Sequence, residues 1–340
     1  MSRHHITTRG VGRNVLVLTF ASLLFASCAQ AAAGLSATGQ PSLSLAAPLT
    51  TLACTSTGAC ITLGASGTAN VPTTAGQVRN HKGVWSALNV PPAPVAFLYD
   101  AACGATRCLV GGTRSGTDLL WSVNANDGAI TALAGPAGGV VIRNLACPTD
   151  SHCTLIDQGA HGLTRYFQTN NAGTTWGRPR ILGWAANRTT RLDCPSASHC
   201  FVATTSTSQH VVLRQTINGA ANWQLVATPP SWTSLDSLHC SLTCVALVTN
   251  AKGSSVASEV KGLWKSTPLS FSATSLACSS VGTCFVVGHF ADGSAAMAKW
   301  QGGAVHDVTL AYVPTSLNHV ACEPTVCVAT GVTTVVSLRP

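Results

Sequence analysis

Fourteen of the fifteen cysteines in this chain of 340 residues fall into seven close pairs, and this arrangement limits the folds open to it. The first members of successive pairs lie 38 to 49 residues apart, and the text around them repeats, as in residues 145–153 and 192–200. A repeat of about 40–50 residues is typical of propeller blades and helical arrays. The seven pairs are Cys54/Cys60, Cys103/Cys108, Cys147/Cys153, Cys194/Cys200, Cys240/Cys244, Cys278/Cys284 and Cys322/Cys327.

The residues that flank the pairs favour strands over helices. Cys200 and Cys284 each begin a short β-branched and aromatic run bounded by Gly, Ser and Thr, as strands are. Each pair brackets three to five residues, which we predict to form a turn. Facing positions on two antiparallel strands lie about 4.5–5.5 Å apart, which a disulfide can span. We therefore predict that each pair is a disulfide that closes the hairpin between the first and second strands of a repeat.

Metal binding or redox chemistry is the alternative use of paired cysteines. No pair has the C-x-x-C spacing of a zinc ribbon or a thioredoxin-like site. His152, His199 and His239 each directly precede a cysteine, and we interpret them as polar turn residues beside a disulfide. The sequence therefore predicts no metal site and no cofactor.

The N-terminal residues have the pattern of a secretory signal. Basic residues precede an apolar run at 15–25 that is too short to span a bilayer. Residues 24–28 resemble a bacterial lipobox, which would make Cys28 a lipidated N-terminus, whereas residues 29–31 offer an ordinary A-x-A cleavage site. We expect a secreted or cell-surface protein with a signal peptide (1–27), a tether (28–40) and a propeller (41–340).

Charge and composition exclude several classes of protein. The chain is 46% hydrophobic and only 9% charged, so it is unlike a disordered chain. Without Arg3, Arg9 and Arg13 of the signal, 16 basic residues face 11 acidic ones, and the formal charge falls from +8 to about +5. No basic cluster suggests nucleic-acid binding. We expect a monomer that meets a membrane only through an N-terminal lipid.

One connection between strands is recognisable. Residues 169–176 read T-N-N-A-G-T-T-W and resemble the Asp-box, S/T-x-D-x-G-x-T-W, of sialidase-type (BNR) propeller repeats; residues 216–223 are a more divergent copy. The resemblance implies a secreted bacterial relative of the sialidase-superfamily propellers, with the box as a structural turn. The residues that match the box, with Asn171 in place of the family's Asp, are Thr169, Asn171, Gly173, Thr175 and Trp176.

The fold that we predict is all-β, a seven-bladed β-propeller of four-stranded antiparallel blades with one hairpin disulfide per blade. In the third repeat we expect strands near residues 142–147, 153–156, 163–168 and 175–181. The last repeat is too short for four strands, so we expect the segment around residues 42–45 to supply the missing outer strand and close the ring.

In the sialidase-type family the Asp-box lies opposite the ligand-binding face, and the cysteine turns share its side. Loops between second and third strands and connectors between blades would then form the ligand face. Basic groups with one Trp would suit an anionic or sugar-like ligand; the alternative is that these are ordinary solvated loop residues. The candidates are Arg114, Asp157, His161, Arg188, Arg191, Trp232, Lys252, His289 and Asp292.

Catalysis would need residues that the sequence does not place well. The resemblance implies a Tyr nucleophile assisted by Glu, an Asp acid/base and three Arg. Glu323 is expected in a cysteine turn on the far face and Glu259 in a third strand, and residues 141–144 match the family's F-R-I-P segment poorly. The three tyrosines are Tyr99, Tyr166 and Tyr312.

The sequence therefore favours a non-catalytic extracytoplasmic binding or scaffold propeller with a glycan or protein ligand. The alternatives are a divergent glycoside hydrolase of sialidase type and a cell-surface structural module without a small ligand. Fold alone does not decide among them.

Overall fold

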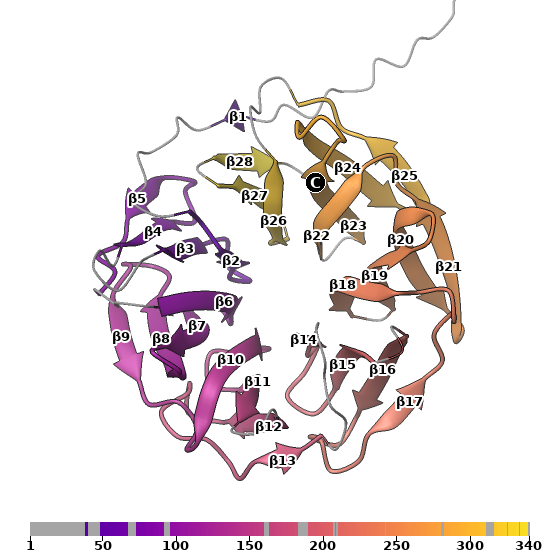
Figure 1. Ribbon diagram of the computed structural model, residues 1–340. Helices are drawn as coiled ribbons and strands as arrows, with labels where there is room; N and C mark the ends of the chain where they lie inside the picture. Colours follow the sequence, from indigo (N-terminus) through magenta and orange to yellow (C-terminus); the bar gives the residue numbers. More distant parts are fainter. Residues whose placement is uncertain are drawn as a thin grey trace, which may run out of the picture. The chain divides into compact units, whose positions relative to one another are not determined.

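Seven four-stranded antiparallel sheets are arranged in a ring (Figure 1). The computed structural model describes residues 38–39, 48–66, 73–91, 96–159, 163–182, 190–206, 208, 210–241, 243–279, 282–310, 316–324, 326–332 and 334–338. Every regular element in these residues is a β-strand. Among them there is no apolar helix long enough to cross a bilayer. Cys28 and the expected signal and tether segments lie outside the described residues, apart from Thr38 and Gly39 at the end of the tether.

Blades 1 to 6 each contain four strands that follow one another in the chain from the inside outward. Blades 1 to 3 are β2 (Thr51–Cys54), β3 (Cys60–Ser66), β4 (Thr73–Arg79), β5 (Trp85–Ala87); β6 (Ala96–Cys103), β7 (Arg107–Arg114), β8 (Thr117–Asn124), β9 (Ile130–Leu133); and β10 (Gly139–Ala146), β11 (Cys153–Gly159), β12 (Thr164–Thr169), β13 (Arg180–Ile181). Blades 4 to 6 are β14 (Thr190–Asp193), β15 (Cys200–Thr205), β16 (Val211–Thr216), β17 (Gln224–Val226); β18 (Ser234–Cys240), β19 (Cys244–Asn250), β20 (Gly253–Val260), β21 (Leu263–Pro268); and β22 (Ser272–Cys278), β23 (Thr283–His289), β24 (Ala295–Gln301), β25 (Ala304–Asp307).

Blade 7 combines strands from the two ends of the described chain. Its strands from the inside outward are β26 (Leu317–Cys322), β27 (Cys327–Gly331), β28 (Val335–Leu338) and β1 (Thr38–Gly39). Thr38 and Gly39 pair with Ser337 and Val336 of β28. The segment at 42–45, which we expected to fill this position, lies outside the described residues.

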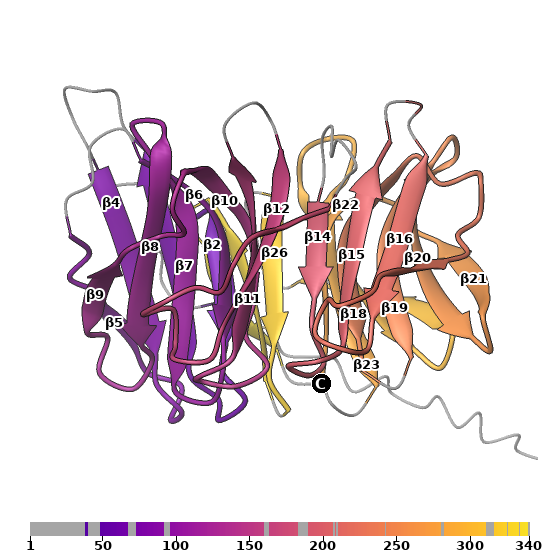
Figure 2. The same cartoon turned by 90° about the horizontal axis from the view of Figure 1, so that it is seen from below.

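The innermost strands form a closed circle, because each contacts the innermost strand of the next blade and β26 contacts β2. This arrangement confirms the predicted seven-bladed propeller. Strands alternate in direction within a blade, so the turns between first and second strands lie on one face and those between second and third strands on the other (Figure 2). We call these the cysteine face and the open face.

All seven predicted cysteine pairs are disulfides that join the first and second strands of a blade. Their Cα–Cα distances are 3.8 to 4.1 Å. In five blades the strand register pairs the two cysteines directly, as it does Cys54 and Cys60. Because disulfides form and persist in oxidising compartments, the chain belongs to an extracytoplasmic environment.

The turn between Cys103 and Cys108 is shorter than we predicted. Residues 104–107 were expected to form it, but β7 already begins at Arg107, one residue before Cys108. Arg107 pairs with Asn124 of β8, so the ladder extends past the disulfide toward the cysteine face. Cys108 is therefore the second residue of its strand and not the residue that ends the turn, which corrects our expectation for this blade.

The second cysteine of each pair is a buried structural residue. Cys108 has no exposed surface, and its side chain belongs to the apolar core between blades 1 and 2. A sulfur enclosed in this way and bonded to its partner is not accessible to a metal or a ligand. The second cysteines that are buried are Cys60, Cys108, Cys153, Cys200, Cys244, Cys284 and Cys327.

The outer strand of blade 3 is shorter than we predicted. Residues 175–181 were expected to form it, but β13 contains only Arg180 and Ile181. Gly177 and Pro179 account for the difference, since Gly weakens a strand and Pro cannot donate to the ladder. The three inner strands of this blade lie within a few residues of their expected bounds.

The hydrophobic core lies between neighbouring blades. One cluster joins Ile61 and Leu63 of blade 1 to Leu98 and Trp121 of blade 2, and similar clusters fill other junctions. The second strands are buried along most of their length, as in β15, because they are covered on both sides. Their nearly continuous apolar runs in the sequence follow from this packing.

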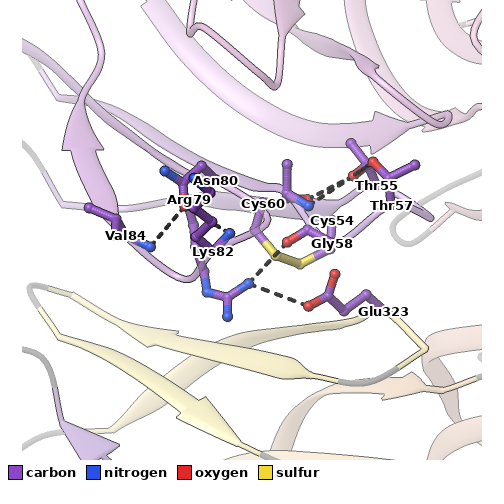
Figure 3. Close-up of polar contacts among 11 residues, drawn as sticks. Cys54, Thr55, Thr57, Gly58, Cys60, Arg79, Asn80, Lys82, Val84 and Glu323 are labelled. Carbon is purple, nitrogen blue, oxygen red and sulfur yellow. Dashed lines mark hydrogen bonds and ion pairs between the residues drawn. A yellow bond between two sulfur atoms is a disulfide. The ribbon is translucent and has the colours of Figure 1, made fainter.

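A buried ion pair joins the last blade to the first (Figure 3). Arg79, at the end of β4, donates from Nη1 to Glu323 Oε1 at 3.3 Å and to the Gly58 carbonyl at 3.0 Å. The side chains of Arg79 and Glu323 are only 9% and 3% exposed. Burial raises the pKa of Glu323, and the nearby guanidinium opposes that shift. A Cβ at residue 58, where φ is +102°, would lie 2.5 Å from the Glu323 carboxylate, so this contact requires Gly58.

Candidate functional site

A central cavity of about 610 Å³ lies on the ring axis. Each of the seven innermost strands contributes to its wall, and at blade 3 the wall extends to Gln158 and Thr164 at the open-face ends of β11 and β12. The volume is within the range of about 300–1,000 Å³ that is usual for ligand pockets. The central cavity is therefore the first candidate for a binding site.

A periodic polar position supplies much of the cavity wall. The residue three places before the first cysteine of each pair is polar in every blade, and six of the seven line the cavity. We did not predict this pattern from the sequence, although the cysteine repeat makes it visible. The six residues are Asp100, Asn144, Arg191, Ser237, Ser275 and His319.

Several of these polar side chains also link neighbouring blades. The Leu145 amide donates to Asp100 Oδ2 at 2.8 Å, and the Leu276 amide donates to Ser237 Oγ at 3.1 Å. The Val320 amide makes the same contact with Ser275, at 3.2 Å. Each bond runs from one innermost strand to the preceding one, so part of the cavity wall is occupied by structural hydrogen bonds.

The residue before this polar position lies at a β-bulge in five blades, so its side chain does not follow the regular alternation of the strand. Register shifts leave Tyr99 and Arg143 unpaired with the second strand of their blades. A bulge re-aims its side chain, and both residues line the cavity. The Arg143 guanidinium lies 4.7 Å from the centre of the Tyr99 ring, and Arg143 Nη2 donates to Gln158 Oε1 at 3.1 Å. Tyr99 is 41% exposed.

Burial shifts the titration of two groups in the cavity wall. It raises the pKa of Asp100 to about 6, although bonds from the Leu145 and Ala101 amides oppose the shift. It lowers the pKa of His319 to about 4, with the charge of Arg191 adding to the effect. His319 is therefore neutral near pH 7, and Asp100 is mostly ionised there.

Three charged residues of blades 2 and 3 meet beside the cavity. Asp157 is fully buried, lines the cavity and accepts two hydrogen bonds from Arg165, one of them from Nε at 2.9 Å. Arg165 Nη1 also donates to the Ala137 carbonyl at 3.0 Å. Both carboxylate oxygens of Asp118 are buried, and neither has a hydrogen-bond partner among the residues that the structure describes. Burial, followed by the charge of Asp157, raises the pKa of Asp118 to about 7, while Arg165 opposes the shift.

The Asp118 carboxylate makes stability depend on pH. Its folded-state pKa is above the ordinary value of 3.8, so the folded protein binds the proton more tightly than the unfolded chain. This group therefore contributes less stability as pH rises from about 4 to about 7. We expect Asp118→Asn to raise the melting temperature by a few degrees at pH 8 and by less at pH 5.

Thermal melts at both pH values, with Asp307→Asn at an exposed position as the matched control, test this prediction. An equal effect of Asp118→Asn at pH 5 and pH 8 would contradict it.

A narrower cavity of about 290 Å³ continues toward the cysteine face. The residue before the first cysteine lines it, and this residue is Ala in five blades but Asp193 and His239 in blades 4 and 5. Burial raises the pKa of Asp193, opposed first by the charge of His239. His239 thus lies in β18 beside the axis, which corrects our expectation of a turn residue; His152 and His199 do lie in turns. No group of three or more His, Cys, Asp or Glu side chains within the described chain is arranged to hold a metal ion.

The residues that we predicted for the ligand face are distributed around the ring. Arg114, Lys252, His289 and Asp292 lie at or beside turns between second and third strands, and none lines the cavity. Asp292 accepts two bonds from Ser294, which lower its pKa. Of the nine candidates only Arg191 and Asp157 line the cavity within the described chain, both from strands rather than loops. His161 and Arg188 lie outside the described residues.

Trp232 requires a correction. It is 1% exposed and packs edge-to-face against Trp264, with the ring centres 5.0 Å apart. A ring enclosed in this way has no free face for a ligand. The expected stacking role of Trp232 is therefore wrong, and its indole stabilises the junction of blades 4 and 5.

The turn at residues 169–176 is held by side-chain hydrogen bonds. Thr169 Oγ1 accepts from the Gly173 amide at 3.1 Å, and Asn171 Oδ1 accepts from the Thr175 amide at 2.9 Å. Residues 216–223 make the equivalent bonds, from the Ala220 amide to the Thr216 hydroxyl and from the Asn222 amide to Asn218. Both turns lie on the cysteine face (Figure 2).

The residues considered for sialidase-type catalysis do not come together. Tyr166 is buried in the core between blades 3 and 4, and Tyr312 lies outside the described residues. Glu323 lies in a cysteine turn and Glu259 in β20, a third strand, as we predicted. Tyr99 is the one of the three tyrosines that lines the cavity within the described chain.

Comparisons with known proteins find solved structures of similar fold but no match at the level of sequence. No family model and no curated protein sequence matches the chain. YCF48 bound to D1 peptide is similar at a TM-score of 0.63 with 11% identity, over 88% of this chain and 95% of that one. YCF48 from Cyanidioschyzon merolae gives a TM-score of 0.62 with 8% identity, over 90% and 99%.

An enzyme structure shares the same architecture. The GH74 enzyme of Niastella koreensis gives a TM-score of 0.63 with 11% identity, over 88% of this chain and 53% of that enzyme. At such identities the likeness concerns the fold alone. The chain is a seven-bladed β-propeller with one disulfide per blade, and its fold is shared by proteins that bind peptides and by proteins that catalyse reactions.

Proposed function

We propose that this protein is a non-catalytic extracytoplasmic binding propeller whose ligand is a peptide segment of a protein partner, held at the open-face mouth of the central cavity. The observation that carries the proposal is the exposed Tyr99–Arg143 stack at the cavity wall. Tyr and Arg are enriched among the residues that dominate protein interfaces. The peptide bound to a YCF48 propeller of similar fold supports this choice of ligand.

The surroundings of the stack fit a peptide. Phe97 lies two residues before Tyr99 in β6 and is 50% exposed. Leu163, next to the cavity-lining Thr164, adds another exposed apolar side chain from blade 3. Asp236 brings a carboxylate to the wall, where the Ser234 and Thr249 hydroxyls donate to it. Apolar groups beside both signs of charge suit a mixed peptide better than a uniformly hydroxylated glycan.

The remaining expectations from the sequence belong to the same proposal. Residues 1–27 serve as a secretory signal and 28–40 as a tether, with Cys28 as the site of a lipid anchor. The bonding of residues 169–176 supports kinship with BNR-type repeats. Arg114, Lys252, His289 and Asp292 provide secondary contacts around the open face.

A selection of random displayed peptides against the immobilised propeller tests the ligand class. For the peptides selected, we expect Tyr99→Ser and Arg143→Ala each to weaken binding at least tenfold, as for residues at the centre of an interface. The matched control is Arg107→Ala. Arg107 is exposed at the cysteine-face end of β7, away from the open-face mouth of the cavity, and its replacement should leave the affinity unchanged. Affinities are measured by calorimetry.

The peptide assignment would be abandoned if no peptide were selected, or if those selected bound both cavity variants with native affinity. A glycan whose binding depends on Tyr99 and Arg143 would show that the site is right and the ligand class wrong.

A further inference from the structure

A second hollow lies on the cysteine face, away from the central cavity. It has a volume of about 660 Å³ and is lined by residues of three turns at the junction of blades 3 and 4. These are the cysteine turns of the two blades and the turn at residues 169–176. We call it the interblade groove and define it by His152, Gln168, Asn170, Trp176, Ser196 and Ser198.

We propose that the interblade groove binds a neutral saccharide. None of the described residues that line it is Asp, Glu, Lys or Arg, in contrast to the wall of the central cavity. The lining instead offers one indole, side-chain amides and hydroxyls. An indole packs against the apolar C–H face of a sugar ring, and amides and hydroxyls bond its hydroxyl groups without any need for charge.

Trp176 has the position that such a site requires. Part of its side chain packs on the core between blades 2 and 3, beside Leu109 and Leu133 of blade 2, and Trp176 also lines the groove. The equivalent Trp223 of the next blade does not line the groove and packs edge-to-face against Tyr166, with the ring centres 5.4 Å apart. Of these two indoles, the one in blade 3 is therefore the one that faces the groove.

The groove is built from rigid parts. The 169–176 turn is closed by the bonds that Thr169 and Asn171 accept from backbone amides, and Ser196 Oγ accepts from the His199 amide at 3.1 Å in the blade 4 turn. Gln168 Nε2 donates across the junction to the Ala197 carbonyl at 3.1 Å. A disulfide holds the cysteine turn of each of the two blades. A preformed site loses little conformational entropy when it binds.

The experiment is a glycan array of neutral glucose-, mannose- and N-acetylglucosamine-based oligosaccharides, with sulfated and sialylated glycans on the same array, followed by calorimetry with the best neutral ligand. We expect binding of neutral oligosaccharides that does not depend on salt concentration. Ser198→Arg, which fills the groove from an exposed turn position, should weaken it at least tenfold. Ser151→Arg, at the equivalent position of the blade 3 turn and outside the groove lining, is the matched control and should bind normally.

A second pair of variants tests the indole. Trp176→Leu should lower the affinity at least tenfold, and Trp223→Leu should not, with near-UV circular dichroism to establish that both are folded. The proposal is overturned if only anionic glycans bind, if no neutral oligosaccharide binds, or if Ser198→Arg binds as well as Ser151→Arg. Tyr99→Ser should leave saccharide binding intact, because Tyr99 lines the central cavity and not the groove, so this result is independent of the peptide proposal.

Discussion

Reduction of the seven disulfides is expected to unfold the propeller at room temperature. Each disulfide closes a loop whose cysteines are only 4 to 6 residues apart, and loop-closure entropy gives about 2 kcal/mol for a loop of this size. The seven lie in separate blades, so their contributions should be nearly additive. Together they are comparable with the roughly 5–15 kcal/mol of net stability that is usual for a folded protein.

Circular dichroism of chains refolded with and without dithiothreitol measures this effect. The double variant Cys240→Ser/Cys244→Ser is the matched control and should lose only about 2 kcal/mol, because six loops remain closed. Thiol titration of the denatured, unreduced chain should detect none of the fourteen paired cysteines. A reduced chain that melts cooperatively near the native temperature would show that the disulfides do not stabilise the ring.

Breaking the ion pair between Arg79 and Glu323 should cause the largest loss from a single substitution. Removal of one partner of a buried pair leaves an uncompensated charge and typically costs about 3–5 kcal/mol. We therefore expect Glu323→Ala to lower the free energy of unfolding by about that amount. Lys82→Met, an exposed cation of the same blade as Arg79, should change it by less than about 0.5 kcal/mol (Figure 3).

The pH dependence of a second variant separates the charge from the packing. In Arg79→Met the Glu323 carboxylate loses the cation that opposes its raised pKa, so it binds a proton more readily in the folded state. Arg79→Met should accordingly lower the free energy of unfolding by less at pH 5 than at pH 8, as measured by denaturant titration. Arg79→Met/Glu323→Met should recover stability, since apolar residues often replace a buried ion pair without loss. A double variant as unstable as Glu323→Ala at both pH values would contradict the assignment.

The cysteine pairs made most of the fold predictable. Their period indicated a propeller-type repeat, their number indicated the number of blades, and the strand signatures beside Cys200 and Cys284 indicated strands and not helices. The bounds of a turn were less predictable, because the ladder beside Cys108 begins one residue earlier than its cysteine suggests. The contact between Arg79 and Glu323 could not be anticipated, because 244 residues separate the two and no local pattern couples them.

The candidate site was harder to predict for two physical reasons. A bulge adds one residue to a strand, so alternation counted along the sequence does not show that Tyr99 and Arg143 face the axis. Connectors have no periodicity, so nothing in the sequence distinguished an exposed Trp232 from the buried one that packs on Trp264. The polar residue three places before each first cysteine was detectable, but only by comparing the repeats with one another.

The two adjacent positions on the innermost strands have different mutational tolerance. Where Asp100, Ser237 or Ser275 accepts a backbone amide of the next blade, a substitution alters the ring as well as the cavity. Among the described residues the bulged Tyr99 carries no such bond, and Arg143 bonds within its own blade and stacks on Tyr99. The bulged Thr274 differs, since its hydroxyl donates to the Leu317 carbonyl of the next blade. Recognition can therefore diverge at Tyr99 and Arg143 while the architecture is inherited unchanged, which makes these two positions the natural place to redesign the specificity of the propeller.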